Sequence, residues 1–168
     1  MLDEICSIWI DRQIEYKEEL PSIEELRSFY GPYLSSHSST FGVWVAIANE
    51  GNDVLGWQSL LPCRAHPVFR SAWAESSTYV KSFGRSSLRP KGIGKALLAH
   101  AMDHAWLSGL STIIGYIRID NSAAIELVES LGWELMGRIA SGADIENRVC
   151  YICPIGGPPN GLTERAAL

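Results

Sequence analysis

Apolar positions recur with a helical period at the start of the chain. Over residues 3 to about 19, Ile5, Ile8 and Trp9 fall on one side of a 3.6-residue repeat. This spacing predicts an amphipathic helix whose apolar side packs on the rest of the protein.

A second helix is predicted to begin at Ser22, because Ser-Ile-Glu-Glu25 has the pattern of a capping box. It is predicted to end near Gly31 and Pro32, since proline interrupts a helix. Short apolar stretches bounded by turn residues then predict strands. In chain order these are Gly42 to Ala48, Val54 to Leu61, about Glu75 to Lys81, Thr112 to Ile119 and a segment from Arg148 to Cys153.

Two more helices separate these strands, one opening at Gly92 and one over Ser122 to Leu131. In the first, Ile93, Leu97, Ala101 and Ala105 recur every four residues, as do Leu98, Met102 and Trp106. Strands that alternate with helices predict an α/β chain with a central mixed sheet, twisted and flanked by helices on both faces.

The turn before the Gly92 helix is basic and carries two glycines, in the order Arg89-Pro-Lys-Gly92-Ile-Gly94. Glycines let the backbone approach an anion closely, and the first amides of a helix have no partner within it. The turn is therefore predicted to hold a diphosphate. The alternative is a solvated basic loop before an ordinary helix.

The charge of this segment also supports the prediction that it binds an anion. Between Lys81 and Met102 the chain has five cations and no acidic residue, although the formal net charge of the protein is −5. A local positive field in an acidic protein favours a bound anion over nucleic acid. The nucleotide-triphosphate loop is excluded because Ala96 follows Gly94-Lys95, and the dinucleotide fingerprint because Leu97 stands where its third glycine belongs.

Length and composition suit one compact domain, expected over residues 1–154, with a glycine- and proline-rich tail at 155–168 that is expected to be disordered. No apolar run has the length of a membrane span, and Asp3 and Glu4 replace the basic start of a signal peptide. We therefore expect a cytoplasmic protein that does not associate with membranes.

No metal is expected. Cys150 and Cys153 supply only two ligands, and residues three apart in a strand point to opposite faces, so buried thiols are the simpler reading. His100 and His104 lie one helical turn apart without an evident third ligand, which favours a solvated helix face.

The spacing of Arg89, Gly92 and Gly94 resembles the Arg/Gln-x-x-Gly-x-Gly/Ala signature of the GNAT (Gcn5-related) N-acetyltransferases. The likeness extends to Tyr79-Val80 upstream and to the segment from Asp120-Asn121 to Leu131-Gly132-Trp133, which is similar to the family's second motif. It covers about residues 1–153, yet the family's usual first strand is missing, because the chain opens in the first helix.

Within that family, the stretch from Pro62 to Arg70 and the sequence Ala74 to Val80 most resemble the phosphinothricin-type branch. The resemblance implies transfer of an acetyl group from acetyl-CoA to the primary amine of a small amino-acid-like substrate. Arg64 and Arg70 are then candidates to bind a substrate carboxylate.

The same resemblance implies roles for other residues. Glu75 would act as the base, directly or through water; its alternative is a capping or salt-bridged carboxylate. An amide at Val80 or Lys81 would face the thioester oxygen, and Asn121 would contact the pantetheine or cap a helix, or both. The residues implied to bind the cofactor are Tyr79, Val80, Lys81, Arg89, Lys91, Gly92, Ile93, Gly94, Lys95 and Asn121.

One position departs from the pattern. Val128 stands where many members have a tyrosine that protonates the departing thiolate, and valine cannot donate. Tyr116 and Tyr151 are candidates for that role, although both also suit packing within strands. The rival functions are a GNAT-fold acyltransferase with another donor or a biosynthetic role, protein amino-terminal acetylation, and a CoA-binding sensor without turnover. A homodimer is expected by analogy with the family.

Overall fold

The structure, a computed structural model, describes residues 1–16, 20–35, 40–49, 51–63, 72–82, 91–138 and 147–156. The elements are α1 (Leu2–Tyr16), α2 (Ile23–Ser35), β1 (Gly42–Ile47), β2 (Val54–Pro62), β3 (Trp73–Val80), α3 (Ile93–Leu107), β4 (Thr112–Arg118), α4 (Ser122–Ser130), β5 (Glu134–Arg138) and β6 (Arg148–Pro154). The predicted site residues Arg64, Arg70 and Arg89, and most of the tail, lie outside the described residues.

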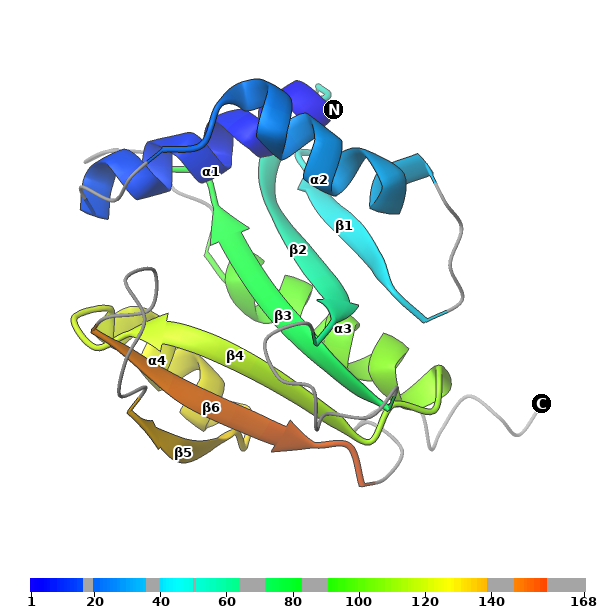
Figure 1. The fold of residues 1–168 in the computed structure, drawn as a ribbon, viewed down its shortest axis with the longest axis vertical. Coiled ribbons are helices and arrows are strands. Elements are labelled where there is room, and N and C mark those ends of the chain that lie inside the picture. Colours follow the sequence, from blue (N-terminus) through cyan, green and yellow to red (C-terminus); the bar gives the residue numbers. More distant parts are fainter. Residues whose placement is uncertain are drawn as a thin grey trace.

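The strands form one six-stranded sheet in the order β1-β2-β3-β4-β6-β5. Strands β3 and β4 run parallel, and every other neighbouring pair is antiparallel. The parallel pair follows from the chain path, because α3 carries the chain over one face between β3 and β4 (Figure 1). The predicted mixed sheet is confirmed.

Helices cover both faces of this sheet, as predicted. One face, the α3/α4 face, has a core in which Leu98 and Ala105 of α3 and Val128 of α4 pack with Ala74 and Tyr151 of the sheet. The other, the α1/α2 face, has a core of α1 and α2 residues around the fully buried Trp57 of β2. Because side chains alternate along a strand, the neighbours of each core residue project to the opposite face.

The end predicted for the second helix is wrong. Helix α2 continues through Pro32 to Ser35. Proline removes one backbone hydrogen bond but fixes φ near the helical value, so packing on one side can hold the helix together. On either side of the proline, Tyr30 is buried in the core of the α1/α2 face and Leu34 packs against that core.

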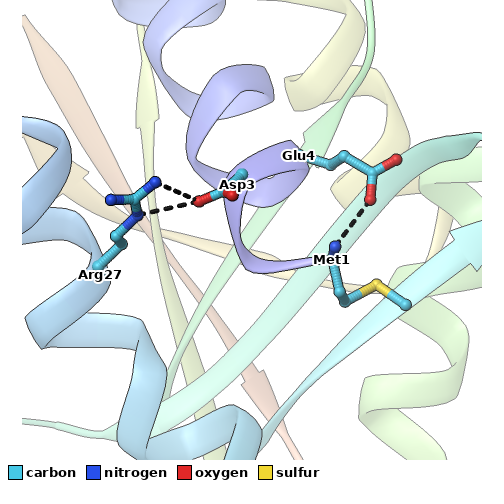
Figure 2. Close-up of polar contacts among 4 residues, drawn as sticks. All are labelled: Met1, Asp3, Glu4 and Arg27. Carbon is cyan, nitrogen blue, oxygen red and sulfur yellow. Dashed lines mark hydrogen bonds and ion pairs between the residues drawn. The ribbon is translucent and has the colours of Figure 1, made fainter.

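One ion pair links α2 to α1, and another lies at the start of α1. Arg27 of α2 donates to Asp3 of α1 at 2.9 and 2.7 Å, and the N-terminal amine of Met1 lies 2.9 Å from the Glu4 carboxylate (Figure 2). The predicted capping box is present before α2, where Glu25 accepts from the Ser22 amide at 2.7 Å, and these bonds lower the pKa of Glu25.

The chain enters α1 at Leu2, so within the described residues no strand precedes this helix, in agreement with the expectation. Across the same part of the chain, no helix has both the length and the apolar character needed to span a membrane.

Candidate active site

Strands β3 and β4 separate after a short region of pairing. Their register runs from Trp73 opposite Thr112 to Glu75 opposite Ile114, and the described pairing ends there. Beyond it the two strands diverge toward their C-terminal ends (Figure 1). We call this divergence of β3 and β4 the splay; it lies in the middle of the strand order.

The β2 ladder decides which backbone groups of β3 face this splay. The Lys81 amide donates to the Leu55 carbonyl at 2.9 Å, so Lys81 is directed to β2. Backbone groups alternate in direction along a strand, which turns those of Val80 and Thr78 toward β4. Two amides were predicted to face the thioester oxygen. The backbone of Val80 is turned toward β4, whereas the N–H of Lys81 is hydrogen-bonded to β2.

Helix α3 begins beside the C-terminal end of β3. Gly92 precedes it with φ 82°, a left-handed conformation that favours glycine, and offers no side chain to accept from the first amides. The first turn has no acidic residue. A Cβ on Gly94 would lie 3.6 Å from Val80 and 3.4 Å from Leu127, so this turn packs against the end of β3 and against α4. The first turn of α3 thus presents amides and a positive dipole end next to β3.

A buried polar network stiffens β3 along the splay. Gln58 of β2 is fully buried on the α3/α4 face. Its Nε2 donates to Ser76 Oγ at 2.8 Å and to the Ser59 carbonyl at 2.7 Å, while its Oε1 accepts from the Thr78 hydroxyl. Ser76 and Thr78 are also residues whose backbone faces the splay. Sequence reasoning missed Gln58; a glutamine in the middle of an apolar strand was the available signal.

Glu75 lies at the point where the splay begins. Its neighbour Ala74 is in the core of the α3/α4 face, so Glu75 projects to the α1/α2 face. Burial raises the pKa of the Glu75 carboxyl. Burial also raises the pKa of Tyr116 to about 12, with Cys150 and Glu75 adding to the shift. A half-buried carboxylate with a raised pKa suits a base that works near neutral pH.

Aromatic rings occupy the α1/α2 face near Glu75. Tyr79 stacks on Trp57 with ring centroids 4.6 Å apart, and Tyr30 of α2 meets the same indole edge-on at 5.0 Å. The side chain of Tyr79 therefore lies on this face, and burial raises the pKa of Tyr30. The Glu75 charge is among the causes that raise the pKa of Tyr30, which places this aromatic group on the same face as the carboxylate.

Three residues of the second motif and its neighbours have defined positions. Asn121 caps α4, since its Oδ1 accepts from the Ala124 amide at 3.2 Å, and this leaves Nδ2 unused by the cap. Val128 is buried in the core of the α3/α4 face. Tyr151 lies on that face too and donates to Glu129 at 2.7 Å, so its hydroxyl already has a partner.

The histidines and cysteines form no metal centre in the part of the chain that is described: no group of three or more His, Cys, Asp or Glu could hold an ion. Cys153 is buried on the α3/α4 face, and Cys150 projects to the other, as predicted for a strand. The solvated face predicted for the histidines is wrong in part, because both rings pack on Trp44, with His104 at 4.7 Å.

The profile of the acetyltransferase (GNAT) family matches residues 2–133. An L-methionine sulfoximine/L-methionine sulfone acetyltransferase of Pseudomonas aeruginosa is 32% identical over 99 residues, 58% of this chain and 55% of that protein. A mycothiol acetyltransferase of Renibacterium salmoninarum is 46% identical over 43 residues, 26% of this chain and 13% of that protein.

Among solved structures, a phosphinothricin acetyltransferase of Sinorhizobium meliloti in complex with AcCoA superposes with a TM-score of 0.73 at 24% identity. The superposition covers 95% of this chain and 89% of that one. The fold is thus shared over nearly the whole chain, whereas the curated relatives match along 13% to 55% of their own length.

Proposed function

Because the chain belongs to the acetyltransferase (GNAT) family, we propose that it is an N-acetyltransferase that moves an acetyl group from acetyl-CoA to the primary amine of a small amino-acid-like substrate. The observation that carries this proposal is the position of Glu75, a carboxylate of raised pKa where β3 and β4 separate. An amine bound on the α1/α2 face would meet there an acyl group that enters through the splay.

The residues around the splay fit the donor. Acetyl-CoA supplies an activated thioester and a diphosphate that anchors it. The amides from Lys91 to Lys95, with Gly92, Ile93 and Gly94 among them, would hold the diphosphate, because they open a helix that has no acid in its first turn. The Val80 amide would donate to the thioester oxygen, and Asn121 Nδ2 to the pantetheine. Arg89 would add a cation.

Transfer of an acetyl group to an amine requires a base, and Glu75 has this role in the proposed reaction. Glu75 takes the proton that the attacking nitrogen must lose, directly or through a water, while the amide facing the carbonyl oxygen stabilises the charge that develops on it. As the C–S bond breaks, its electron pair goes to sulfur. The nitrogen forms a C–N bond to the acetyl carbon in the same exchange, and the thiolate takes a proton from solvent, so the products are an amide and CoA.

Support for an amino-acid-like acceptor comes from the relatives, whose names include a methionine sulfone acetyltransferase and a phosphinothricin acetyltransferase. Arg64 and Arg70 remain proposed contacts for a substrate carboxylate. A homodimer and a cytoplasmic location remain predictions.

The test is release of CoA thiol from acetyl-CoA with amino acids, methionine sulfone, phosphinothricin, polyamines and short peptides as acceptors. Glu75→Gln is expected to lower kcat by about 10²–10⁴-fold, as for loss of a general base. Glu134→Gln removes an exposed carboxylate of β5 and is expected to leave kcat unchanged.

Donor binding is tested separately by calorimetry with acetyl-CoA. Gly92→Glu is expected to abolish binding, because it places a carboxylate at the first turn of α3. Gly109→Glu is the matched control, since Gly109 also has positive φ and open space around it but lies beyond the other end of the helix. Equal losses in the two variants would argue against a diphosphate at Gly92.

A second candidate, a CoA-binding sensor without turnover, is favoured by Val128, which replaces a proton donor with a side chain buried in the core. Acetyl-CoA binding that Gly92→Glu abolishes, combined with no thiol release for any acceptor, would support the sensor or a different acyl donor. Turnover that depends on Glu75 would exclude the sensor.

A further inference from the structure

Two polar side chains beside the splay lack a hydrogen-bond partner. The carboxylate of Glu75 and the phenol of Tyr116 are both half-buried, and neither forms a hydrogen bond with another residue in the described part of the chain. Polar groups that lose contact with water are nearly always hydrogen-bonded in folded proteins. A pair of such groups next to each other indicates a ligand that supplies the partner, so their relative position matters.

Both side chains project to the α1/α2 face. On β3, Ala74 belongs to the core of the opposite face, which turns Glu75 to this one. On β4, a Cβ at Gly115 would lie 3.1 Å from the ring of Trp133, a residue of the α3/α4 core. The next residue, Tyr116, is therefore turned to the α1/α2 face.

The strand register brings the carboxylate and the phenol close together. Glu75 is paired with Ile114, and Tyr116 is the next residue of β4 on the same face. Neighbouring strands lie about 4.8 Å apart and alternate residues about 6.6 Å, which separates the two Cα atoms by roughly 8 Å. Side chains of this length can both reach one nitrogen atom between them, because that needs oxygens only about 5 Å apart. The Glu75 charge helps to raise the pKa of Tyr116, as expected for neighbours.

The residues around the phenol do not bind its oxygen. Cys150, its register partner on β6, has its Sγ 3.9 Å from Met136 Sδ and 4.0 Å from the Tyr151 carbonyl. On β3 the next residue of this face is Ser77. The described pairing with β4 ends before Ser77, and no hydrogen bond between described residues joins its hydroxyl to Tyr116.

The phenol is poorly suited to protonate a departing thiolate. Burial raises the pKa of Tyr116 to about 12. An alkyl thiol such as that of cysteine has a pKa of about 8.5, so proton transfer from this phenol to a thiolate is uphill by roughly three pKa units. A phenol that keeps its proton still accepts hydrogen bonds through its oxygen.

We propose that Tyr116 holds the attacking nitrogen of the acceptor by accepting the N–H that this nitrogen keeps, while Glu75 takes the proton that it loses. This inference rests on the proposed function. A neutral primary amine has two N–H groups and one lone pair. With one N–H at each oxygen, the lone pair is left to form the C–N bond to the acetyl carbon. The C–S bond breaks with its electron pair going to sulfur, and the N–H at Tyr116 remains in the product amide.

The hydrogen bond to Tyr116 is stronger in the transition state than before it. The nitrogen gains positive charge as the C–N bond forms, and hydrogen bonds from charged donors are about twice as strong as neutral ones. An interaction that strengthens in this way raises kcat. A secondary amine has a single N–H, which Glu75 must remove, so it has none to offer Tyr116. The phenol is therefore expected to favour primary over secondary amines.

Thiol release with primary amines and their N-methyl derivatives tests this role. The primary amines are L-methionine sulfone, L-leucine and phenethylamine. Tyr116→Phe keeps the ring and removes only the phenol oxygen. It is expected to lower kcat for primary amines about 10- to 100-fold, and to lower the ratio of kcat/KM for primary over N-methyl amine by a similar factor. The Kd for acetyl-CoA and the melting temperature are expected to match wild type.

Tyr151→Phe is the matched control. It also removes a phenol oxygen from a strand of the same sheet, but on the α3/α4 face, where that hydroxyl donates to Glu129 at 2.7 Å. Its ratio of kcat/KM for primary over N-methyl amine is expected to equal that of wild type.

The outcomes separate this inference from the proposed function. An unchanged kcat in Tyr116→Phe, or an equal loss for primary and N-methyl amines, overturns the inference and leaves the acetyltransferase in place. If wild type does not acetylate the N-methyl amines, a loss of kcat without a change in acetyl-CoA affinity or melting temperature supports the inference, and a loss accompanied by either change overturns it. No thiol release by wild type with any acceptor overturns the proposed function itself.

Discussion

The phenol of Tyr151 donates a 2.7 Å hydrogen bond to the carboxylate of Glu129 and thereby joins β6 to α4. The ring is 3% exposed and belongs to the core of the α3/α4 face, so this bond is part of the packing between sheet and helix. A hydroxyl held in this way is not available to a departing thiolate in the splay. The two strand tyrosines thus differ in role, since Tyr116 projects to the opposite face.

Tyr151→Phe is therefore expected to change stability and leave chemistry alone. Losing the bond costs about 1 kcal/mol in the free energy of unfolding, because the ring itself still packs. Urea denaturation measures the cost, and thiol release measures kcat, which is expected to stay within about twofold of wild type. A loss of kcat with unchanged stability would contradict this and assign Tyr151 to the reaction.

Glu75 predicts a pH dependence of stability with a definite sign. Burial raises its pKa in the folded protein above the unfolded value, so folding favours the protonated form. The stability that this group contributes is present at low pH and is lost as pH rises through the folded pKa. Glu75→Gln is neutral at every pH, and its melting temperature relative to wild type is expected to rise from pH 4 to pH 8.

The raised pKa of Glu75 is also expected to affect the pH dependence of turnover. In the pH profile of kcat/KM, the low-pH limb reports the pKa of the base in the free enzyme. The midpoint of this limb is expected to lie above the usual glutamate pKa. In Glu75→Gln the limb is expected to disappear. Calorimetric melting and thiol release across the pH series measure the two effects. A variant that is less stable than wild type at pH 8 would show that Glu75 is a paired structural carboxylate.

Gly56 is expected to be required for the position of β3. A Cβ there would lie 2.7 Å from the Tyr79 carbonyl and 3.2 Å from Val80 Cα, both of them backbone atoms that cannot turn aside. Gly56→Ala must displace the end of β3, at an expected cost of about 1–3 kcal/mol, and the displacement should raise the Kd for acetyl-CoA. Denaturation and calorimetry measure the two changes.

Gly42→Ala provides the comparison, because a Cβ at Gly42 would meet only the Trp44 ring at ordinary contact distances of 3.5 Å and more. Its stability and its Kd for acetyl-CoA are expected to match wild type. If Gly56→Ala behaved in the same way, the close approach of β2 to β3 would have no part in donor binding.

Patterns within a single segment were predictable from the sequence. The four-residue repeat after Gly92 placed Ile93, Leu97 and Ala101 on one side of a helix, and α3 buries all three. The capping box before α2 was recognised in the same way. Each depends on residues within a few positions of one another, where helix geometry alone fixes what lies together.

Relations between segments were not predictable in this way. The end of α2 was misplaced because its passage through Pro32 depends on packing of the residues around it. The position of Tyr116 next to Glu75 was not recognised, since it follows from the parallel register that α3 sets up. Alternation within a strand gives two sets of residues but does not say which set faces the acceptor.

Gln58 allows a test of whether the buried network serves stability or donor binding. Gln58→Met leaves the buried Ser76 hydroxyl and the partly buried Thr78 hydroxyl without their partner, and an unsatisfied buried group costs about 1–3 kcal/mol. Replacing all three partners in Gln58→Met/Ser76→Ala/Thr78→Val removes the unsatisfied groups, and the triple variant is expected to regain most of the lost stability in urea denaturation. Its Kd for acetyl-CoA is nevertheless expected to stay about tenfold or more above wild type, because the hydrogen bonds that fix the splay-facing residues of β3 are gone. A triple variant that recovers both stability and affinity would show that any well-packed core holds β3 in place, and that the polar network is not needed for donor binding.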